Sequence, residues 1–157
     1  MSKQAVTNST CLIGLERIGR LDLLPQVFDT VFAPPTVAAE VHSPLTWLTV
    51  QTVENSAFVA ALKTQMDEGE AEAIALAVEL DNVILILDDK KARRVAQQIG
   101  LKVIGTVGML LRAKNQGVIT EIKPLLTELV QVDFRITNAI IQEALRLSGE
   151  DSPLTSD

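Results

Sequence analysis

Two adjacent carboxylates, Asp88 and Asp89, follow directly on an aliphatic run at residues 83–87. Two carboxylates about 4 Å apart repel each other by about 4 kcal/mol at an effective dielectric constant of 20. A bound divalent cation turns that repulsion into coordination, and carboxylate oxygens suit Mg²⁺ or Mn²⁺ better than zinc. Such a cation can activate water and neutralise the charge that develops on a phosphodiester. The pair therefore predicts a site for hydrolysis assisted by a divalent metal.

Other oxygen-bearing side chains fall where they could join this pair. Asn8 follows an early β-like run, while Glu40, Glu70 and Glu72 lie on or beside predicted helices. In an open parallel sheet, ligands bind outside the carboxyl ends of the strands. We therefore expect these side chains to face one crevice together with the two aspartates.

A purely structural explanation of these acids stays open. Asp is a favoured helix N-cap, and acids in a first helical turn complement the helix dipole. One aspartate would suffice for a cap, and Glu70 and Glu72 open a predicted helix. Glu40 stands near a predicted helix end, where the dipole disfavours a negative charge. Cys11, on an apolar helical face, is interpreted as a core residue.

Four cations follow the aspartates within five residues: Lys90, Lys91, Arg93 and Arg94. The net charge of −6 argues against a protein that coats nucleic acid in general. Its distribution is uneven, since acids dominate residues 54–89 and bases dominate residues 90–114. The four cations are candidate phosphate contacts. Solvated helix faces are the alternative explanation of the same pattern.

Length and composition predict one domain over residues 1–149 and a flexible C-terminal tail over 150–157. A chain of 157 residues buries roughly 70% of the surface that its unfolded form exposes. No apolar run approaches the roughly 18 residues that a membrane helix needs, and the N-terminus lacks a secretory pattern. The single cysteine excludes an internal disulfide. These features predict a cytoplasmic protein without a membrane partner. Neither a G-x-S-x-G nor a Walker A motif is present.

Short β-like runs alternate with helical patterns, which is typical of βαβ units and a parallel sheet. Strands are expected at residues 4–7, 30–33, 82–87, 101–105 and 133–137. Residues 47–53 are either an edge strand or part of a long loop. Helices are expected at residues 9–18, 35–41, 56–66, 69–80, 89–99, 106–116, 121–130 and 138–149, with a break around Gly69.

Three segments resemble the PIN-domain family, in particular its small prokaryotic branch: "CLIGLERIGRLDLL" with "PPTVAAEV", then "GEAEAIALAVEL", then "LILDDKKARRVAQQIGLKVIGTVGMLLRAKNQG". They cover most of residues 6–126. The resemblance implies a three-layer α/β/α fold with a central parallel sheet flanked by helices. It also implies a ribonuclease that depends on Mg²⁺ or Mn²⁺. Members include toxins of toxin–antitoxin pairs, so an antitoxin protein and a homodimer are expected partners beside RNA.

Carried over by position, the family's acids fall at Asn8, Glu40, Glu72 and Asp89, with Asp88 beside the last and Glu70 as the alternative to Glu72. The resemblance implies that these residues bind the metal, that Asp88 supports them, and that the Thr10 hydroxyl orients water or metal. Asn8 departs from the family's acid. An amide offers a metal one neutral oxygen and cannot serve as a base. Reduced metal binding or hydrolysis is the expected consequence.

Three functions follow from these observations. The first is a divalent-metal-dependent ribonuclease, weakened by Asn8. The second is a catalytically silent domain that binds RNA or protein and keeps the fold. A phospho-receiver is disfavoured, because its acidic pair would follow the first strand, whereas this pair lies past mid-chain. With four Phe and one Trp, stacking on aromatic rings is not expected to dominate RNA binding.

Overall fold

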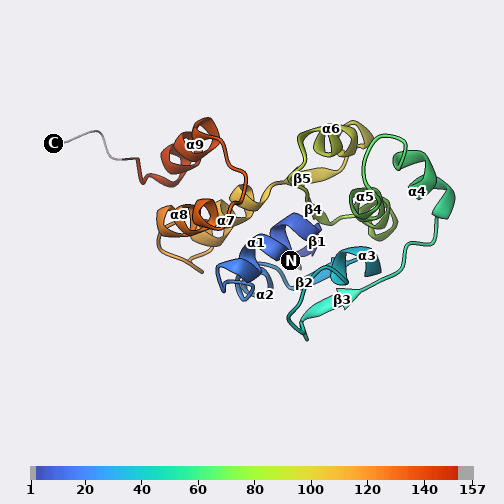
Figure 1. Cartoon of the computed structure of the whole chain (residues 1–157), viewed down its shortest axis with the longest axis horizontal. Coiled ribbons are helices and arrows are strands. Elements are labelled where there is room, and N and C mark those ends of the chain that lie inside the picture. Colours follow the sequence, from blue (N-terminus) through green and yellow to red (C-terminus); the bar gives the residue numbers. More distant parts are fainter. Residues whose placement is uncertain (1–2, 152–157) are drawn as a thin grey trace.

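The computed structural model describes residues 3–151, which form a parallel sheet with helices on both faces (Figure 1). The strand order is β3-β2-β1-β4-β5, and every pair of neighbours is parallel. The strands are β1 (Gln4–Val6), β2 (Thr30–Ala33), β3 (Leu48–Val50), β4 (Ile84–Ile86) and β5 (Lys102–Ile104). The predicted three-layer α/β/α fold is confirmed. The ambiguous segment 47–53 supplies an edge strand.

Side chains of the inner strands alternate between two hydrophobic cores. Ala5 and Ile86 belong to one core, whereas Val6 and Leu85 belong to the other, and all four are fully buried. Successive residues of a strand point to opposite faces of the sheet, so a strand that is covered on both faces has to be apolar throughout. This explains the unbroken aliphatic run before Asp88.

The helices divide between the two cores. Buried residues of the first core come from α1 (Ser9–Arg17), α2 (Leu23–Val27), α3 (Pro35–Ala38), α7 (Thr106–Asn115), α8 (Lys123–Gln131) and α9 (Asn138–Ser148). Those of the second come from α4 (Ser56–Leu62), α5 (Glu68–Leu80) and α6 (Lys90–Ile99). In Figure 1, α7, α8 and α9 gather at one end of the view and α4, α5 and α6 at the other. Among the described residues, no helix is both long and apolar enough to cross a membrane.

One expected strand is wrong. Residues 133–137 form no strand, because the chain turns there after α8: Asp133 has a φ of 66°, and the Phe134 N–H donates to the Leu129 carbonyl at 2.9 Å. The helix break expected around Gly69 is found at residues 63–67, between α4 and α5. Asp67 caps α5 through a reciprocal capping box with Glu70, so Gly69 falls inside the first turn. The short helix α2 was not anticipated.

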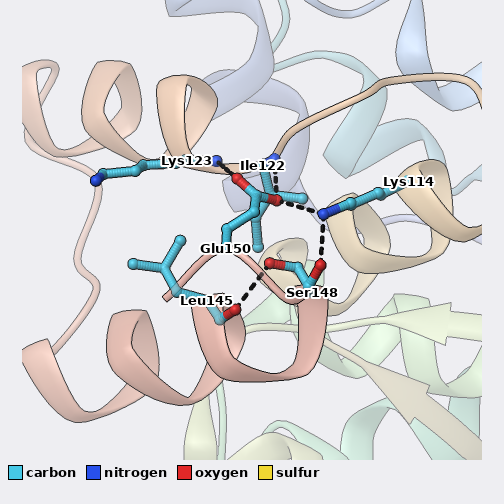
Figure 2. Close-up of polar contacts among 6 residues, drawn as sticks. All are labelled: Lys114, Ile122, Lys123, Leu145, Ser148 and Glu150. Carbon is cyan, nitrogen blue, oxygen red and sulfur yellow. Dashed lines mark hydrogen bonds and ion pairs between the residues drawn. The ribbon is translucent and has the colours of Figure 1, made fainter. Parts of the chain in front are cut away.

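Glu150 ties the end of α9 to α7 and α8, as Figure 2 shows. Its carboxylate accepts hydrogen bonds from the N–H groups of Ile122 at 2.8 Å and Lys123 at 3.0 Å, and from Lys114 Nζ at 2.9 Å. Ile122 precedes α8 and provides no side-chain cap, so Glu150 satisfies donors at that helix start. Glu150 therefore belongs to the folded chain, although the tail was expected to begin there. Residues 152–157 of that tail lie outside the described residues.

Candidate functional site

The candidate site lies where β1 and β4 end and the next helices begin. These strands are neighbours in the sheet, with Val6 paired to Leu85. The residues that follow them, Asn8 and Asp88, are therefore placed side by side at the carboxyl edge of the sheet. This is the position expected for ligand binding in a parallel α/β fold.

Asn8 is buried and uses both ends of its amide. Its Oδ1 accepts the Cys11 N–H at 3.0 Å and so caps α1, while its Nδ2 donates to Asp88 Oδ2 at 3.4 Å. The chemistry of the neighbours supports this orientation, because a backbone N–H can only donate and an ionised carboxylate can only accept. The amide thus presents hydrogen atoms to Asp88.

Asp88 also holds the start of α7. Its Oδ1 accepts the Thr106 N–H at 2.8 Å, and its Oδ2 accepts the Thr106 hydroxyl at 2.7 Å. Gly105, the N-cap of α7, has no side chain to cap the helix, and a Cβ there would lie 3.1 Å from Asp88 Oδ1. Asp88 therefore caps α7 from the neighbouring strand end.

Cys11 lies close to this site but is fully buried. Burial, followed by the charge of Asp88, raises the pKa of the Cys11 thiol to about 12. Its interpretation as a core residue is confirmed.

Asp89 has a different structural role. Its Oδ2 accepts the Ala92 N–H at 2.9 Å, which makes Asp89 the N-cap of α6. The two aspartates therefore cap two different helices, and helix capping accounts for both of them. That explanation does not exclude chemistry, because Asp89 is exposed and has a second carboxylate oxygen.

Both aspartates line a cleft of about 500 Å³, called the main cleft below. Its wall is formed by Thr10, Ile13, Gly14 and Arg17 of α1, by Asp88, Asp89 and Lys90, and by Val132, Asp133, Phe134 and Arg135 between α8 and α9. Of the residues expected at the site, Thr10, Asp88, Asp89 and Lys90 are thus brought together. The segment that contains Asp133, Phe134 and Arg135 was expected to be a strand and was not assigned to the site.

A second hollow of about 390 Å³, called the acidic cleft, adjoins the main cleft and shares Thr10 and Ile13 with it. Glu40 and Glu70 line it together with Asp67 and Glu68. Burial raises the pKa of Glu70 to about 7, and the charges of Asp67 and Asp89 add to that effect. Glu70 is therefore close enough to Asp89 for their charges to interact.

Glu72 lies on α5 and lines neither cleft, yet its Oε1 is buried and has no hydrogen-bond partner among the described residues. A buried oxygen of this kind costs free energy, and a cation is a chemically suitable partner for it. Within residues 3–151, however, no three His, Cys, Asp or Glu side chains form a group that could hold a metal ion. Convergence of Asn8, Glu40, Glu72 and Asp89 on one ion stays a prediction.

The four cations of α6 have different surroundings. Lys90 lines the main cleft, and Arg93 lines an adjacent groove of about 480 Å³ that also includes Asp88. Lys91 and Arg94 are exposed and line neither of these hollows. Two cations of the main cleft, Arg17 and Arg135, were missed. Thr10, Gly14 and Arg17 are spaced to lie on one face of a helix, so the sequence could have placed Arg17 beside Thr10 at the site. No pattern in the sequence places Arg135 there.

Comparison with known families agrees with this architecture. A family model described as PIN domain matches residues 4–150. The chain belongs to the PIN domain family. The match extends beyond the resemblance at residues 6–126 and includes both the Phe134 segment and Glu150. A PIN domain has a nuclease-like fold, which agrees with acids at the carboxyl edge of the sheet. Among curated proteins, no sequence matches this chain.

Proposed function

We propose that this PIN-domain protein binds RNA and cleaves it with the help of Mg²⁺ or Mn²⁺, and that Asn8 lowers the rate. The contact between Asn8 Nδ2 and Asp88 Oδ2 carries the proposal. At the position where the family's acid is expected, the amide removes one negative charge and points hydrogen atoms at the neighbouring carboxylate. A divalent cation is therefore attracted less strongly than by two carboxylates.

The remaining donors fit a hard cation in chemical type. Glu40, Asp89 and either Glu72 or Glu70 would hold it, and the buried Glu72 Oε1 has no partner among the described residues. When bound, the cation supplies an activated water and neutralises charge on the phosphodiester. Asp88 positions Asn8 and Thr106 through its hydrogen bonds. Lys90 and Arg93 are proposed to contact phosphates, and the exposed Thr10, shared by both clefts, to orient water or RNA.

The second candidate is a PIN domain that binds RNA or protein without cleaving it. Two observations favour this function: Asp88 and Asp89 both cap helices, and no three acids form a metal-binding group within residues 3–151. An antitoxin partner, a homodimer and a cytoplasmic location are proposed from the family resemblance and the single cysteine alone.

A ribonuclease assay separates the two candidates. A labelled RNA is incubated with the native chain, with Asn8→Asp, with Asp89→Asn and with Asn8→Asp/Asp89→Asn over titrations of Mg²⁺ and Mn²⁺. We expect slow native cleavage, a gain of tenfold or more for Asn8→Asp, and loss of that gain in the double variant. Equal and negligible cleavage by native and Asn8→Asp chains would favour the silent domain. Strong native cleavage that Asp89→Asn leaves unchanged would discard the assigned site.

A further inference from the structure

One wall of the main cleft is formed by residues that the family resemblance did not assign: Arg17, Phe134 and Arg135. We propose that this wall is a nucleotide subsite, in which the Phe134 ring stacks on a base of single-stranded RNA while Arg17 and Arg135 contact its phosphates. The subsite rests on the proposed function, because it would hold RNA beside Asp88 and Asp89.

The Phe134 ring is held in place by a close approach to α1. A Cβ added at Gly14 would lie 2.6 Å from Phe134 Cδ2 and 2.8 Å from Cε2, so only glycine leaves room for the ring edge. Arg17 Nη1 donates to the Val132 carbonyl at 3.4 Å, which links the same helix to the segment before Phe134. A ring fixed in this way loses little conformational freedom when a base stacks on it.

The Phe134 side chain packs against the first core but stays partly exposed. Phe134 is half-buried and contributes to the walls of both the main cleft and the adjacent groove that contains Arg93. The volume of the main cleft, about 500 Å³, falls in the range of small-ligand sites and can accept a nucleotide. A partly exposed aromatic residue in the wall of a cleft of this size suits base stacking.

Cations in the wall of the main cleft could contact the phosphates of a bound strand. Arg17 and Arg135 are exposed, and Lys90 lines the same cleft; the acids in its wall are Asp88, Asp89 and Asp133. Sites for single-stranded nucleic acid combine cations that follow the backbone with aromatic rings that stack on bases. A single ring also agrees with the low aromatic content, since it provides one stacking position rather than a platform for several bases.

Binding of a short single-stranded RNA carrying 2-aminopurine tests the subsite, first in EDTA, so that no metal-dependent cleavage occurs, and then in Mn²⁺. Anisotropy gives the affinity, and quenching of 2-aminopurine reports stacking. We expect Phe134→Leu to weaken binding roughly 5- to 150-fold and to abolish quenching, whereas Phe134→Trp restores both. Arg135→Ala should weaken binding and reduce its dependence on salt. Phe58→Leu and Lys63→Ala, on or beside α4, are matched controls that should bind like the native chain.

The outcomes distinguish the subsite from the proposed function. Native-like affinity and quenching in a folded Phe134→Leu variant would overturn the subsite and leave the function standing. No RNA binding by the native chain in either EDTA or Mn²⁺ would overturn both. Tighter binding of the DNA strand of the same sequence would overturn RNA as the occupant. Thermal unfolding of each variant shows that a loss of binding is not a loss of folding.

Discussion

The side-chain amide of Asn8 lies between the first turn of α1 and the carboxylate of Asp88, with Nδ2 3.4 Å from Asp88 Oδ2. This contact joins the ends of two neighbouring parallel strands. An aspartate at position 8 would bring two negative charges together here, whereas the asparagine forms a hydrogen bond inside the protein. The hydrogen bond therefore links the two strand ends within the protein.

Replacing Asn8 by Asp should destabilise the metal-free protein. Asp remains a good N-cap for α1, so the helix start is preserved. Two carboxylate oxygens 3.4 Å apart would repel each other by about 5 kcal/mol at a dielectric constant of 20. Small movements and proton uptake relieve much of this, and we expect a loss of about 1–3 kcal/mol in the free energy of unfolding in urea with EDTA.

The reversed pair is the matched control for this loss. In Asn8→Asp/Asp88→Asn, the new amide can accept the Thr106 N–H and donate to both the Thr106 hydroxyl and the new aspartate. Most of the lost stability should return. If the double variant is less stable than Asn8→Asp alone, charge repulsion is not the cause of the loss.

Removal of the Glu150 carboxylate should loosen the attachment of α9. Glu150→Ala leaves the N–H groups of Ile122 and Lys123 without this acceptor and leaves Lys114 with the Ser148 carbonyl alone, which should cost about 1–3 kcal/mol of unfolding free energy. Glu143→Ala removes an exposed carboxylate on α9 and is the matched control, with little expected change. A Glu150→Ala variant as stable as this control would show that the contact contributes nothing.

The same contact should depend on pH. Burial alone would raise the pKa of Glu150, but hydrogen bonds from Ile122, Lys114 and Lys123 outweigh it and lower the pKa to about 2. A carboxyl group with a lowered folded pKa stabilises the protein above its unfolded pKa of 4.5, and loses that effect as pH falls towards 2. The difference in melting temperature between native and Glu150→Gln chains should therefore shrink from pH 5 to pH 2. A constant difference would contradict this assignment.

The contribution of Glu70 to stability should depend on pH in the opposite direction to that of Glu150. Its folded pKa of about 7 lies above the ordinary value of 4.5, so its contribution to stability is lost as pH rises between these values. Glu70→Gln keeps the side-chain oxygen that completes the capping box and removes the charge beside Asp67 and Asp89. We expect Glu70→Gln to melt at a higher temperature than the native chain at pH 8 and at the same temperature at pH 4. An equal difference at both pH values would argue against a raised pKa.

Gly14→Ala should have effects of opposite sign in two backgrounds. In the native chain the new Cβ meets the Phe134 ring, and such overpacking typically costs about 1–3 kcal/mol. In a Phe134→Ala background the obstacle is gone, and alanine favours a helix by up to about 1 kcal/mol over glycine. Urea unfolding of the four chains measures this coupling. The same loss in both backgrounds would show that Phe134 does not require the glycine.

Much of the fold was predictable because its signals are local. The aliphatic run before Asp88 predicted a strand covered on both faces, and β4 lies inside the sheet between β1 and β5. Capping residues such as Asn8 and Asp89 are also local signals, because each lies directly before the helix that it caps. Where the local pattern of a segment was ambiguous, tertiary contacts determined its structure. The alternating run 133–137 suggests a strand, but its backbone turns back onto α8 and lines the main cleft.

The site was predictable only in part. Parallel strands end at one edge of a sheet, so the sequence alone was enough to expect Asn8 and Asp88 to be close together. The Asn8 amide orientation depends on the Cys11 N–H and Asp88 together, and it required the structure. Phe134 and Arg135 reach the cleft only because the segment between α8 and α9 folds against Gly14 of α1. Contacts over such a distance in sequence leave no periodic pattern.

The affinity for Mn²⁺, measured by calorimetry on metal-free protein, tests most directly whether Asn8 attenuates a metal-dependent site. Native, Asn8→Asp and Asn8→Asp/Asp89→Asn chains are titrated at pH 7.5, and the last two differ by one carboxylate. Loss of a residue that only hydrogen-bonds a metal ligand changes metal affinity by about 10- to 100-fold, so a new carboxylate at position 8 should tighten binding at least tenfold. We expect weak native binding, tight binding by Asn8→Asp, and loss of the gain when Asp89 is neutralised. Equal Mn²⁺ affinity in the native and Asn8→Asp chains would contradict the attenuation of a metal site by Asn8.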